Sequence, residues 1–548
     1  MSLMKIVIVG GVAGGASAAA RARRCNPRAE ITILEKGSVI SFANCGLPYH
    51  IGGEIALRQK LLVATPELFW KRFRIAVRTQ HDVTRIDREH RRVEAIDLLT
   101  GQVVTIPYDR LILSTGSEPN KPAASVPWPS NVSQLWTLSD MDRIIETIRS
   151  QNVKRAVVVG GGFVGLEVVE QLHRLGIAVT LVERNPQVLM PLDVAFARII
   201  ENCLVEKGVD LKLGVDLQDF TIENGFATAA NLSNGTKIAT ELVVVGAGVR
   251  PRTSLAVDAG LLIGESGGVT VNSFMQTSDP DVYAVGDMVE LVHGVLNEPV
   301  RIPLAGPANR AGRIAGEHAA GGDSPAMGKI LGTAIVRVFE LTAACTGLSE
   351  KACSAKDIPF KASIILAPSH ASYFPGAQSL QLKIVYSPTD GKLLGAQAVG
   401  GDGVDKRIDV IATAIHFGAT VWQLAELDLA YAPPFGSAKD PIHMAAFCAC
   451  NDLSNAPNLI SPNADLSGKQ IVDVRTAKER LELPLPHAIS IEIDEFPERW
   501  QELDPNKPTV VVCHSGKRAH IGACWLRGNG FKDVSNLTGG MSIRSLLS

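Results

Sequence analysis

Two cysteines lie in local sequences that suit thiol chemistry. Cys45 belongs to the stretch SFANCGLPY, residues 41–49, and the next cysteine along the chain is Cys203, so a local dithiol cannot form. A lone thiol stores its redox state as a mixed disulfide, a persulfide or a sulfenate. Gly46 and Pro48 suit a turn that leads into a helix. Cys45 is therefore a candidate redox centre at the start of a helix.

Cys513 belongs to the stretch VVVCHSGKRAH, residues 510–520. This pattern predicts a buried strand that ends at the cysteine, a tight loop and then a helix. Loop amides between a strand and a helix form a cradle for an anion, and Arg518 adds a cation. Such a loop would stabilise a thiolate or a persulfide.

Two segments elsewhere have the order strand, glycine-rich turn, helix, strand. The first has its turn at residues 10–15, between a strand at 5–9 and a helix at 16–25, and its second strand is at 31–35. The second segment repeats this order at 155–159, 160–165, 166–175 and 178–183. Two βαβ units of this kind predict two dinucleotide-binding domains built on parallel sheets.

The second turn is a full G-x-G-x-x-G match, with Gly160, Gly162 and Gly165. Glu183 ends the following strand, where a carboxylate can accept hydrogen bonds from a ribose. The same carboxylate would repel a 2′-phosphate, so the turn favours NADH. Arg184 follows directly and leaves NADPH as the less favoured alternative.

The first turn keeps Gly10 and Gly15, but Val12 stands at the middle glycine position. Amides at the start of its helix can still face a pyrophosphate, and Glu35 ends the second strand. A later strand, within TSDPDVYAVGDMVE at residues 277–290, delivers Gly286 and Asp287 into a turn. The glycine allows a ligand to approach closely, and the Asp carboxylate can bond a polyol such as a ribityl chain.

The two turns and the Gly286–Asp287 segment, in this order, resemble the flavoprotein disulfide reductases with two dinucleotide-binding domains. The resemblance covers residues 4 to about 450 and implies FAD at the first turn and NADH at the second. The residues that it assigns to FAD are Gly10, Gly15, Glu35, Gly286 and Asp287, and those that it assigns to NADH are Gly160, Gly162, Gly165 and Glu183.

SFANCGLPY resembles the single-cysteine branch of this family, which contains coenzyme A disulfide reductases, NADH oxidases and NADH peroxidases. In the CoA-using members the cysteine forms a mixed disulfide with CoA. A helix start and an adjacent oxidised flavin would lower the pKa of Cys45. The substrate-binding residues that the resemblance implies are Ser17, Arg21, Arg24, Ser41, Asn44, Lys71, Asn309 and Lys439. Arg and Lys suit the phosphates of CoA, while Ser and Asn suit its pantetheine amides.

Two tyrosines support the same branch. HASYFPGA, residues 370–377, resembles the H-x-x-Y-Y-P-G segment of the CoA-type enzymes, with Tyr373 kept and Phe374 at the second position. In LAYAPPFGS, residues 429–437, Tyr431 would reach the flavin and the cysteine of a partner subunit. Either phenol can protonate a departing thiolate, and the change at Phe374 makes Tyr431 the better candidate. The resemblance therefore implies a homodimer.

The C-terminal segment, about 467–548, resembles a rhodanese domain. Its motifs are the C-x-x-G-x-R loop, which maps onto Cys513, Gly516 and Arg518, together with IVDVR at 471–475 and NLTGG at 536–540. The resemblance implies a catalytic Cys513 assisted by Arg518. An inactive rhodanese module used for docking is the alternative.

The predicted fold class is α/β: two Rossmann-like domains, one for FAD and one for NAD, an α+β dimerisation domain, and a C-terminal α/β rhodanese domain. The predicted boundaries are 1–120 with 245–328 for the FAD domain, 121–244 for the NAD domain, 329–450 for dimerisation, 451–466 for a linker and 467–548 for rhodanese.

The composition excludes several classes of function. The chain has 548 residues, 46% of them hydrophobic, and a net charge of −2, which argues against nucleic-acid and membrane-surface binding. No run approaches the roughly 18 apolar residues that span a bilayer, and residues 6–9 suit a first strand better than a signal peptide. Nine scattered cysteines do not form a secreted disulfide framework. We therefore expect a cytoplasmic protein, and no metal site.

The whole chain resembles fusions of a CoA disulfide reductase with a rhodanese domain, which implies NADH-dependent reduction of persulfides or polysulfide in sulfur metabolism. Plain CoA disulfide reduction would use the same site. An NADH oxidase or peroxidase would cycle Cys45 through a sulfenate, but that branch typically has a His where Val12 and Ala13 stand. A redox-sensing docking scaffold is the non-enzymatic alternative. The sequence ranks neither the sulfur acceptors nor the order of sulfur transfer between Cys513 and Cys45, and it leaves open whether CoA is substrate or bound cofactor.

Overall fold

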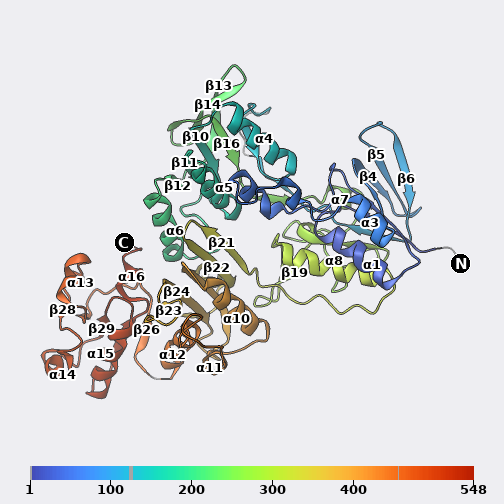
Figure 1. Ribbon diagram of the computed structural model, residues 1–548. Coiled ribbons are helices and arrows are strands. Elements are labelled where there is room, and N and C mark those ends of the chain that lie inside the picture. Colours follow the sequence, from blue (N-terminus) through green and yellow to red (C-terminus); the bar gives the residue numbers. More distant parts are fainter. Residues whose placement is uncertain (1–2, 122–126, 455, 548) are drawn as a thin grey trace. The chain divides into compact units, whose positions relative to one another are not determined.

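The computed structural model describes residues 3–121, 127–454 and 456–547 (Figure 1). It divides into two compact units. Met1–Arg184 with Val215–Gly332 form the N-terminal unit, and Asn185–Gly214 with Thr333–Ser548 form the C-terminal unit. The predicted boundary between the FAD and NAD domains, at 120–121, adjoins residues 122–126, which lie outside the described ones.

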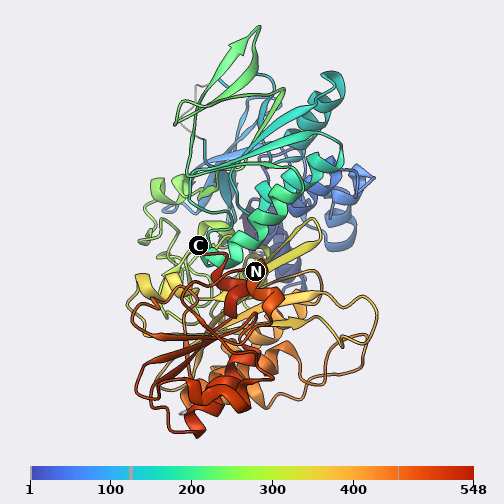
Figure 2. The ribbon, with the colours of Figure 1, turned by 90° about the vertical axis from the view of Figure 1, so that its left-hand side faces the viewer.

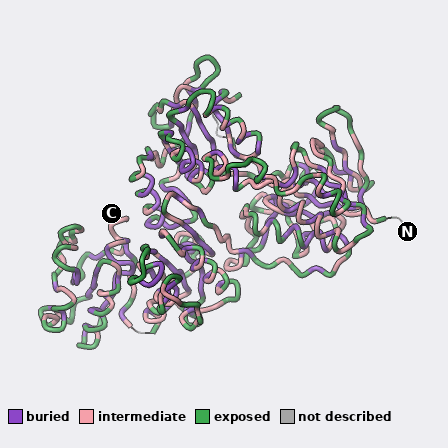
Figure 3. Tube along the Cα trace, in the orientation of Figure 1, coloured by how far each residue is buried: buried purple, intermediate pink, exposed green. Residues whose placement is uncertain are grey.

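The N-terminal unit contains two parallel sheets. The first has the order β18-β7-β1-β2-β3, with bounds Val282–Ala284, Arg110–Leu113, Lys5–Val9, Glu30–Leu34 and Ala76–Arg78. The second includes β11-β10-β16-β9, with bounds Ala178–Glu183, Arg155–Val159, Leu242–Val245 and Val132–Gln134. The central strands β1, β10 and β16 are almost wholly buried, as the purple tube of Figure 3 shows. These Val- and Ile-rich runs are typical of parallel strands covered on both faces.

Antiparallel strands complete this unit. They form two three-stranded sheets, β4-β5-β6 (His81–Asp87, Arg92–Asp97, Val103–Pro107) and β13-β14-β15 (Leu217–Glu223, Phe226–Leu232, Lys237–Ala239). Two short pairs are β8-β17 (Ser117–Pro119, Val249–Pro251) and β19-β20 (Leu291–Val292, Pro299–Val300). The helices are α1 Gly14–Cys25, η1 Asn44–Gly46, α2 Leu47–Ile51, η2 Arg58–Leu61, α3 Pro66–Phe73, α4 Leu138–Ser150, α5 Phe163–Arg174, α7 Ser254–Asp258, η3 Gly286–Met288 and α8 Ala305–Ala319.

Small residues let α1 and α8 approach each other closely. A Cβ added at Gly312 would lie 2.2 Å from the Gly14 carbonyl oxygen, and one at Gly316 would lie 2.2 Å from that of Ala18. Since α1 follows the first glycine turn and α8 packs on η3, this contact brings the Asp287 turn close to the first glycine turn.

The C-terminal unit contains an antiparallel sheet, β21-β22-β25-β24-β23, with bounds Ala334–Val338, Leu341–Gly347, Leu393–Gly400, Ser379–Tyr386 and Lys361–Pro368. Its other elements before the rhodanese segment are α6 Val194–Glu206, β12 Asp210–Leu213, α9 Glu350–Ala355, α10 Val404–His416, α11 Val421–Ala425 and α12 Pro441–Leu453. The buried Asp193, at the start of α6, accepts hydrogen bonds from Lys383 Nζ at 2.9 Å and Gln397 Nε2 at 2.8 Å. This pairing fixes α6 to the sheet.

The rhodanese segment forms a parallel sheet, β26-β30-β29-β27-β28, with bounds Asn458–Ile460, Val534–Leu537, Thr509–Val512, Gln470–Asp473 and Ile489–Ser490. Its helices, red and orange in Figure 2, are α13 Ala477–Glu482, α14 Phe496–Arg499, η4 Trp500–Glu502, α15 Lys517–Gly528 and α16 Gly540–Arg544. The expected linker, 451–466, contains the end of α12 and the edge strand β26. The backbone of β26 pairs with β30, so this part of the stretch belongs to the parallel sheet.

The predicted βαβ units are confirmed. The strands at 5–9, 155–159 and 178–183 have the bounds that the sequence predicts. The helix after each glycine turn begins two or three residues earlier than expected, at Gly14 and Phe163, because the turns enter the helical conformation before their last glycine. Among the described residues, no helix combines the length and apolar character that crossing a bilayer requires.

Candidate active site

Both glycine turns are built for close backbone approach. Gly10 and Gly160 have φ values of +92° and +108°, where a side chain is strained. A Cβ at Gly15 would lie 1.9 Å from the Gly10 carbonyl oxygen, and one at Gly165 would lie 1.9 Å from that of Gly160. These glycines are required by the fold itself, because the helix starts against the turn.

Gly162 differs from its neighbours. It lies at the N-cap of α5, and a Cβ there would meet no protein atom within 4 Å. The missing side chain leaves open space in front of a helix N-terminus, as an approaching pyrophosphate requires. The geometry at the second turn therefore fits a dinucleotide.

The two predicted ribose-binding carboxylates occupy equivalent positions. Glu35 accepts hydrogen bonds from the backbone N–H groups of Gly11 at 2.8 Å and Gly37 at 2.7 Å. Glu183 accepts one from Gly161 at 2.6 Å. Each carboxylate is thus held against its glycine turn, where the ribose of a dinucleotide would lie.

Asp287 follows Gly286, whose φ is +83°, in the short helix η3. Its Oδ2 accepts a hydrogen bond from the Ser117 hydroxyl at 2.8 Å, and burial raises the pKa of its carboxyl. The sequence reasoning missed Ser117, which directly follows the Ser114–Gly116 turn after β7. The two residues form a polar pair that fits a polyol.

Cys45 lies in η1, directly before α2, where Pro48 occupies the first turn. The residue is exposed. Tyr49, on α2, donates a hydrogen bond at 2.9 Å to Glu167 on α5, the helix that follows the second glycine turn. The fold therefore brings the predicted redox cysteine to a junction between the two predicted cofactor turns. The sequence reasoning singled out neither Glu167 nor Tyr49, although Tyr49 is the last residue of SFANCGLPY.

The protein groups around Cys45 do not lower its pKa. Desolvation raises the pKa of this thiol, and the carboxylates of Glu167 and then Asp287 raise it further. A backbone hydrogen bond opposes them but is outweighed. The expectation of a lowered pKa includes an adjacent oxidised flavin; the polypeptide by itself acts in the opposite direction, chiefly because desolvation outweighs the backbone hydrogen bond.

The predicted CoA-binding residues fall into separate groups. Ser17 on α1 and Asn309 on α8 are brought together, with the Ser17 hydroxyl 2.6 Å from Asn309 Oδ1. Arg24 lies over the Phe73 ring at 5.7 Å, and Lys71 is exposed on the same helix as Phe73. These residues leave polar and cationic groups at the α1–α8 and α1–α3 surfaces of the N-terminal unit.

Three further residues of the predicted CoA-binding set already have contacts within the protein. Arg21 Nε and Nη2 pair with the Glu317 carboxylate, at 2.9 and 2.6 Å, so the charge expected for a CoA phosphate already has a partner. Ser41 is buried with a φ of +46°, and its backbone N–H donates to the Gly11 carbonyl oxygen. Asn44 donates to the Trp136 carbonyl oxygen at 3.4 Å.

The two predicted tyrosines meet in the C-terminal unit. Their hydroxyl oxygens are 2.9 Å apart, and this hydrogen bond raises the pKa of Tyr373. Both side chains are exposed, as is Phe374. Lys439 is also exposed, directly before Asp440, which caps α12 and binds Arg407. The structure thus places a phenol pair on the surface of this unit.

The Cys513 loop has the predicted order of strand, loop and helix. Cys513 directly follows β29 and is fully buried, and its Sγ accepts a hydrogen bond from the Gly516 N–H at 3.1 Å. Gly516 has a φ of +90° and caps α15, while Asn536 Nδ2 holds its carbonyl oxygen at 3.1 Å. The sulfur therefore faces a loop amide, as an anion cradle requires.

Arg518, the cation predicted beside Cys513, also pairs with a carboxylate. Both of its terminal nitrogens contact the Glu479 carboxylate, one at 2.8 Å, and this pairing lowers the pKa of Glu479 to about 2. Arg518 remains close enough for Cys513 to raise its own pKa. Glu479, which also completes the capping box of Thr476 on α13, was missed because it lies 39 residues away in sequence.

The NLTGG motif joins the Cys513 loop to the sheet of the dimerisation segment. Met541 N–H donates to the Cys513 carbonyl oxygen at 2.8 Å. On the other side, the Thr538 hydroxyl accepts a hydrogen bond from Ile364 N–H on β23 at 2.8 Å, and Gly539 N–H donates to the Ile364 carbonyl oxygen at 3.0 Å. One short segment thus holds both the active loop and a neighbouring strand.

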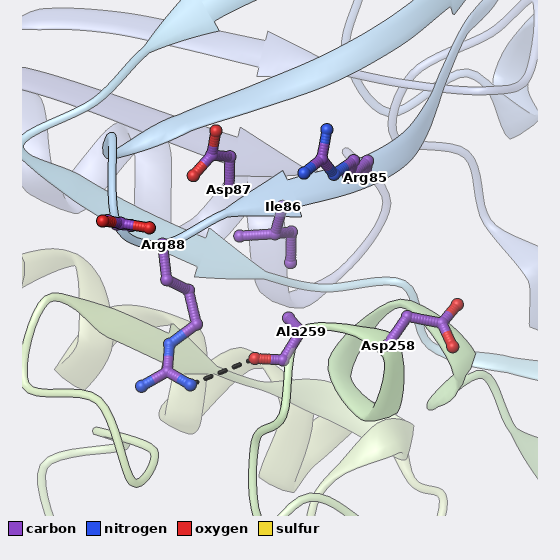
Figure 4. A pocket seen from close by; sticks show the side chains of 7 residues that line it. Arg85, Ile86, Asp87, Arg88, Asp258 and Ala259 are labelled. Atoms are coloured by element: carbon purple, nitrogen blue, oxygen red, sulfur yellow. Dashed lines mark hydrogen bonds between the residues drawn. The ribbon is translucent and has the colours of Figure 1, made fainter.

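Other clusters give no comparable site. A shallow pocket of about 260 Å³ lies beside β4 and the end of α7 (Figure 4). Its Arg88 donates to the Ala259 carbonyl oxygen at 3.0 Å and to Asp279 at 2.7 Å, so its charge is already paired. Within the described residues, no group of three or more His, Cys, Asp or Glu side chains is placed to hold a metal ion.

Comparisons with known proteins agree with this geometry. Residues 4–312 match the family described as pyridine nucleotide-disulphide oxidoreductase. The chain belongs to this family. Residues 333–441 match the family's dimerisation domain, and residues 458–542 match the rhodanese-like domain. The predicted fold class is therefore confirmed, and the protein is an oxidoreductase.

Relatives within the pyridine nucleotide-disulphide oxidoreductases cover most or all of the chain. The coenzyme A disulfide reductase of Staphylococcus aureus is 34% identical over 446 residues, which are 81% of this chain and 99% of that protein. The structure of reduced Bacillus anthracis CoADR-RHD has a TM-score of 0.97 and 39% identity, and covers 100% of this chain and 98% of that one. An NAD-dependent persulfide reductase from A. fulgidus has a TM-score of 0.92 and 36% identity, and covers 98% and 100%.

Proposed function

We propose that this oxidoreductase uses NADH and FAD to reduce the sulfur–sulfur bonds of CoA persulfide, other persulfides or polysulfide, and releases hydrosulfide. The observation that carries the proposal is the presence of two thiol sites in one chain. Cys45 adjoins the glycine-turn helix α5 through Tyr49 and Glu167, and Cys513 lies in an intact amide-lined loop. The persulfide reductase relative, which shares both parts of the chain, supports this reading.

The cofactor assignment rests on the two turns. Gly10, Gly15, Glu35, Gly286 and Asp287 would hold FAD, which when bound supplies the transfer of two electrons from the nicotinamide to sulfur. Gly160, Gly162, Gly165 and Glu183 would hold the pyridine nucleotide. The buried Glu183 carboxylate favours NADH over NADPH, because a 2′-phosphate beside it would add a second negative charge.

The chemistry at Cys45 balances as follows. The Cys45 thiolate attacks the outer sulfur of R–S–SH, so a new sulfur–sulfur bond forms, the old one breaks and RS⁻ leaves. Two electrons and one proton then convert the Cys45 persulfide to the Cys45 thiolate and H₂S. Because its surroundings raise the thiol's pKa, Cys45 needs a group that takes its proton, and the Glu167 carboxylate, which is bonded to Tyr49 and acts electrostatically on Cys45, would serve.

Cys513 would handle the sulfane sulfur before or after this step, by carrying it to Cys45 or by taking it from a donor. Its cradle, the Gly516 N–H with Arg518 close by, suits the negative charge of a persulfide. CoA would be recognised by Ser17, Arg21, Arg24, Ser41, Asn44, Lys71, Asn309 and Lys439. Of these, Ser17 with Asn309, and Arg24 near Lys71, have the arrangement that best supports the assignment.

We also propose a homodimer, since residues 333–441 match a dimerisation domain. Tyr431, with Tyr373 behind it, would then act at the partner's flavin and cysteine. The free state of all nine cysteines supports a reducing, cytoplasmic location. The domain boundaries are proposed as predicted, except that β26 extends the rhodanese domain to about residue 458.

CoA disulfide reduction is the second candidate, favoured by the 34% identity to the Staphylococcus aureus enzyme. It would use the same thiol: Cys45 attacks CoA disulfide, one CoA thiolate leaves, and reduction of the mixed disulfide releases the other. No hydrosulfide would form, and the intact Cys513 loop would have no role.

The test measures NADH consumption and hydrosulfide release together under anaerobic conditions, for the native protein and for Cys45→Ser and Cys513→Ser. We expect one hydrosulfide per NADH with CoA persulfide or polysulfide, and none with Cys45→Ser. The Cys513→Ser result then places the rhodanese step. Turnover only with CoA disulfide or with oxygen, without hydrosulfide, would overturn the proposal, and no turnover with any acceptor would favour a docking scaffold.

A further inference from the structure

Arg301 carries buried hydrogen-bond donors that the described part of the chain does not satisfy. It lies between β20 and α8, four residues before Ala305. Its Nε and Nη1 are both buried, and neither has a hydrogen-bond partner. Burying a charged donor without an acceptor is unfavourable, because the group loses water and gains nothing in return. The side chain is therefore placed for an acceptor that the polypeptide does not supply.

Other partly buried arginines of the same unit are paired. Arg21 contacts Glu317, and Arg110 contacts Asp281. Arg301 has a carboxylate in its surroundings as well, since its positive charge partly offsets the rise that burial causes in the pKa of Asp287. The two do not form an ion pair, however, because Asp287 Oδ2 instead accepts from the Ser117 hydroxyl at 2.8 Å. Arg301 and Asp287 are thus near each other, and the guanidinium keeps two donors free.

The order and packing of the elements around Arg301 indicate which ligand its two unpaired donors would bind. The β19–β20 pair follows η3 directly, and α8, which follows Arg301, packs on η3. Asp287 on η3 is the residue assigned to the ribityl chain of FAD, and that chain ends on the pyrophosphate. The Nε–H and Nη1–H groups of a guanidinium point in different directions, so they suit two separate acceptors. A ribityl oxygen and the adjoining phosphate offer such a pair, and guanidinium binds phosphate well.

We propose that Arg301 binds FAD at the junction of its ribityl chain and its pyrophosphate. This inference rests on the FAD assignment in the proposed function. It adds a cation to a site that otherwise contributes backbone amides and the carboxylates Glu35 and Asp287. The positive charge offsets both carboxylates, which would repel the phosphates.

The test compares flavin affinities of the apoprotein by quenching of flavin fluorescence. FAD and riboflavin are titrated into the native protein, Arg301→Gln and Arg301→Lys, with Arg310→Gln, an exposed arginine of α8, as the matched control. We expect Arg301→Gln to weaken FAD binding by about tenfold or more and riboflavin binding much less, because riboflavin has no pyrophosphate. Arg301→Lys should recover part of the loss.

The melting temperature of each apoprotein provides a second readout. Because an unpaired buried charge is removed, apo Arg301→Gln should be at least as stable as the native apoprotein. A less stable apoprotein would make Arg301 a structural residue, and unchanged FAD affinity, or equal losses for FAD and riboflavin, would overturn the phosphate assignment. If the native protein itself binds no FAD, the proposed function fails instead.

Discussion

Gly162 and Gly165 lie three residues apart in the same turn, yet we expect alanine to have a different effect at each. It should lower the stability of the fold at Gly165 and weaken NADH binding at Gly162. At Gly165 the added Cβ would lie 1.9 Å from the Gly160 carbonyl oxygen and 3.0 Å from its carbonyl carbon, both backbone atoms. The start of α5 must therefore move away from β10. At Gly162 the Cβ would meet nothing within 4 Å. Only a bound cofactor can collide with it.

The magnitudes follow from this difference. Overpacking against backbone costs about 1–3 kcal/mol, so Gly165→Ala should lower the melting temperature of the apoprotein by about 2–4 °C per kcal/mol. Gly162→Ala should lower the free energy of unfolding by less than about 1 kcal/mol, because alanine is only a somewhat poorer N-cap residue than glycine. If its methyl group fills cofactor space, a clash of similar size weakens NADH binding by about 5- to 150-fold.

The assays are thermal unfolding of each apoprotein and NADH titration of each FAD-loaded protein, with FAD content as the control for the first turn. Equal destabilisation by both substitutions would refute the packing argument. Unchanged NADH affinity in Gly162→Ala would refute the assignment of that open space to the nucleotide.

Three further predictions concern single contacts. Thr538→Val leaves the buried Ile364 N–H without its acceptor, so we expect the free energy of unfolding to fall by about 1–3 kcal/mol in denaturant titrations; a change below about 0.5 kcal/mol would contradict the bond's role. The pKa of Glu479 is lowered by Arg518 from 4.5 to about 2, so this pair stabilises the fold above pH 4.5 and loses its effect as the pH falls toward 2. The melting-temperature gap between native protein and Glu479→Gln should shrink over that interval, and a constant gap would disprove the linkage. Glu183→Ala should lower the ratio of kcat/KM for NADH to that for NADPH by about tenfold or more, and an unchanged ratio would show that this carboxylate does not read the ribose.

Much of the local structure could be predicted because it depends on neighbours in sequence. The strands Lys5–Val9 and Arg155–Val159 have their predicted bounds, since apolar runs and glycine turns define them locally. The context of Cys45 was equally readable, because a lone cysteine followed by glycine and proline fixes both its redox options and its place before a helix.

The tertiary structure alone decided which charges meet. Arg21 pairs with Glu317, which lies 296 positions further along the chain. Glu167 accepts a hydrogen bond from Tyr49, 118 positions before it, and this contact brings Glu167 toward the Cys45 segment. Neither contact leaves a local pattern, since each arises where separate helices pack. The thiol's pKa therefore moved against the expectation drawn from its helix position, and Arg21 lost the free charge that its residue type implied. Sequence determined which groups could do chemistry here, and packing determined which of them are free to do it, because electrostatic partners are set by distance in space.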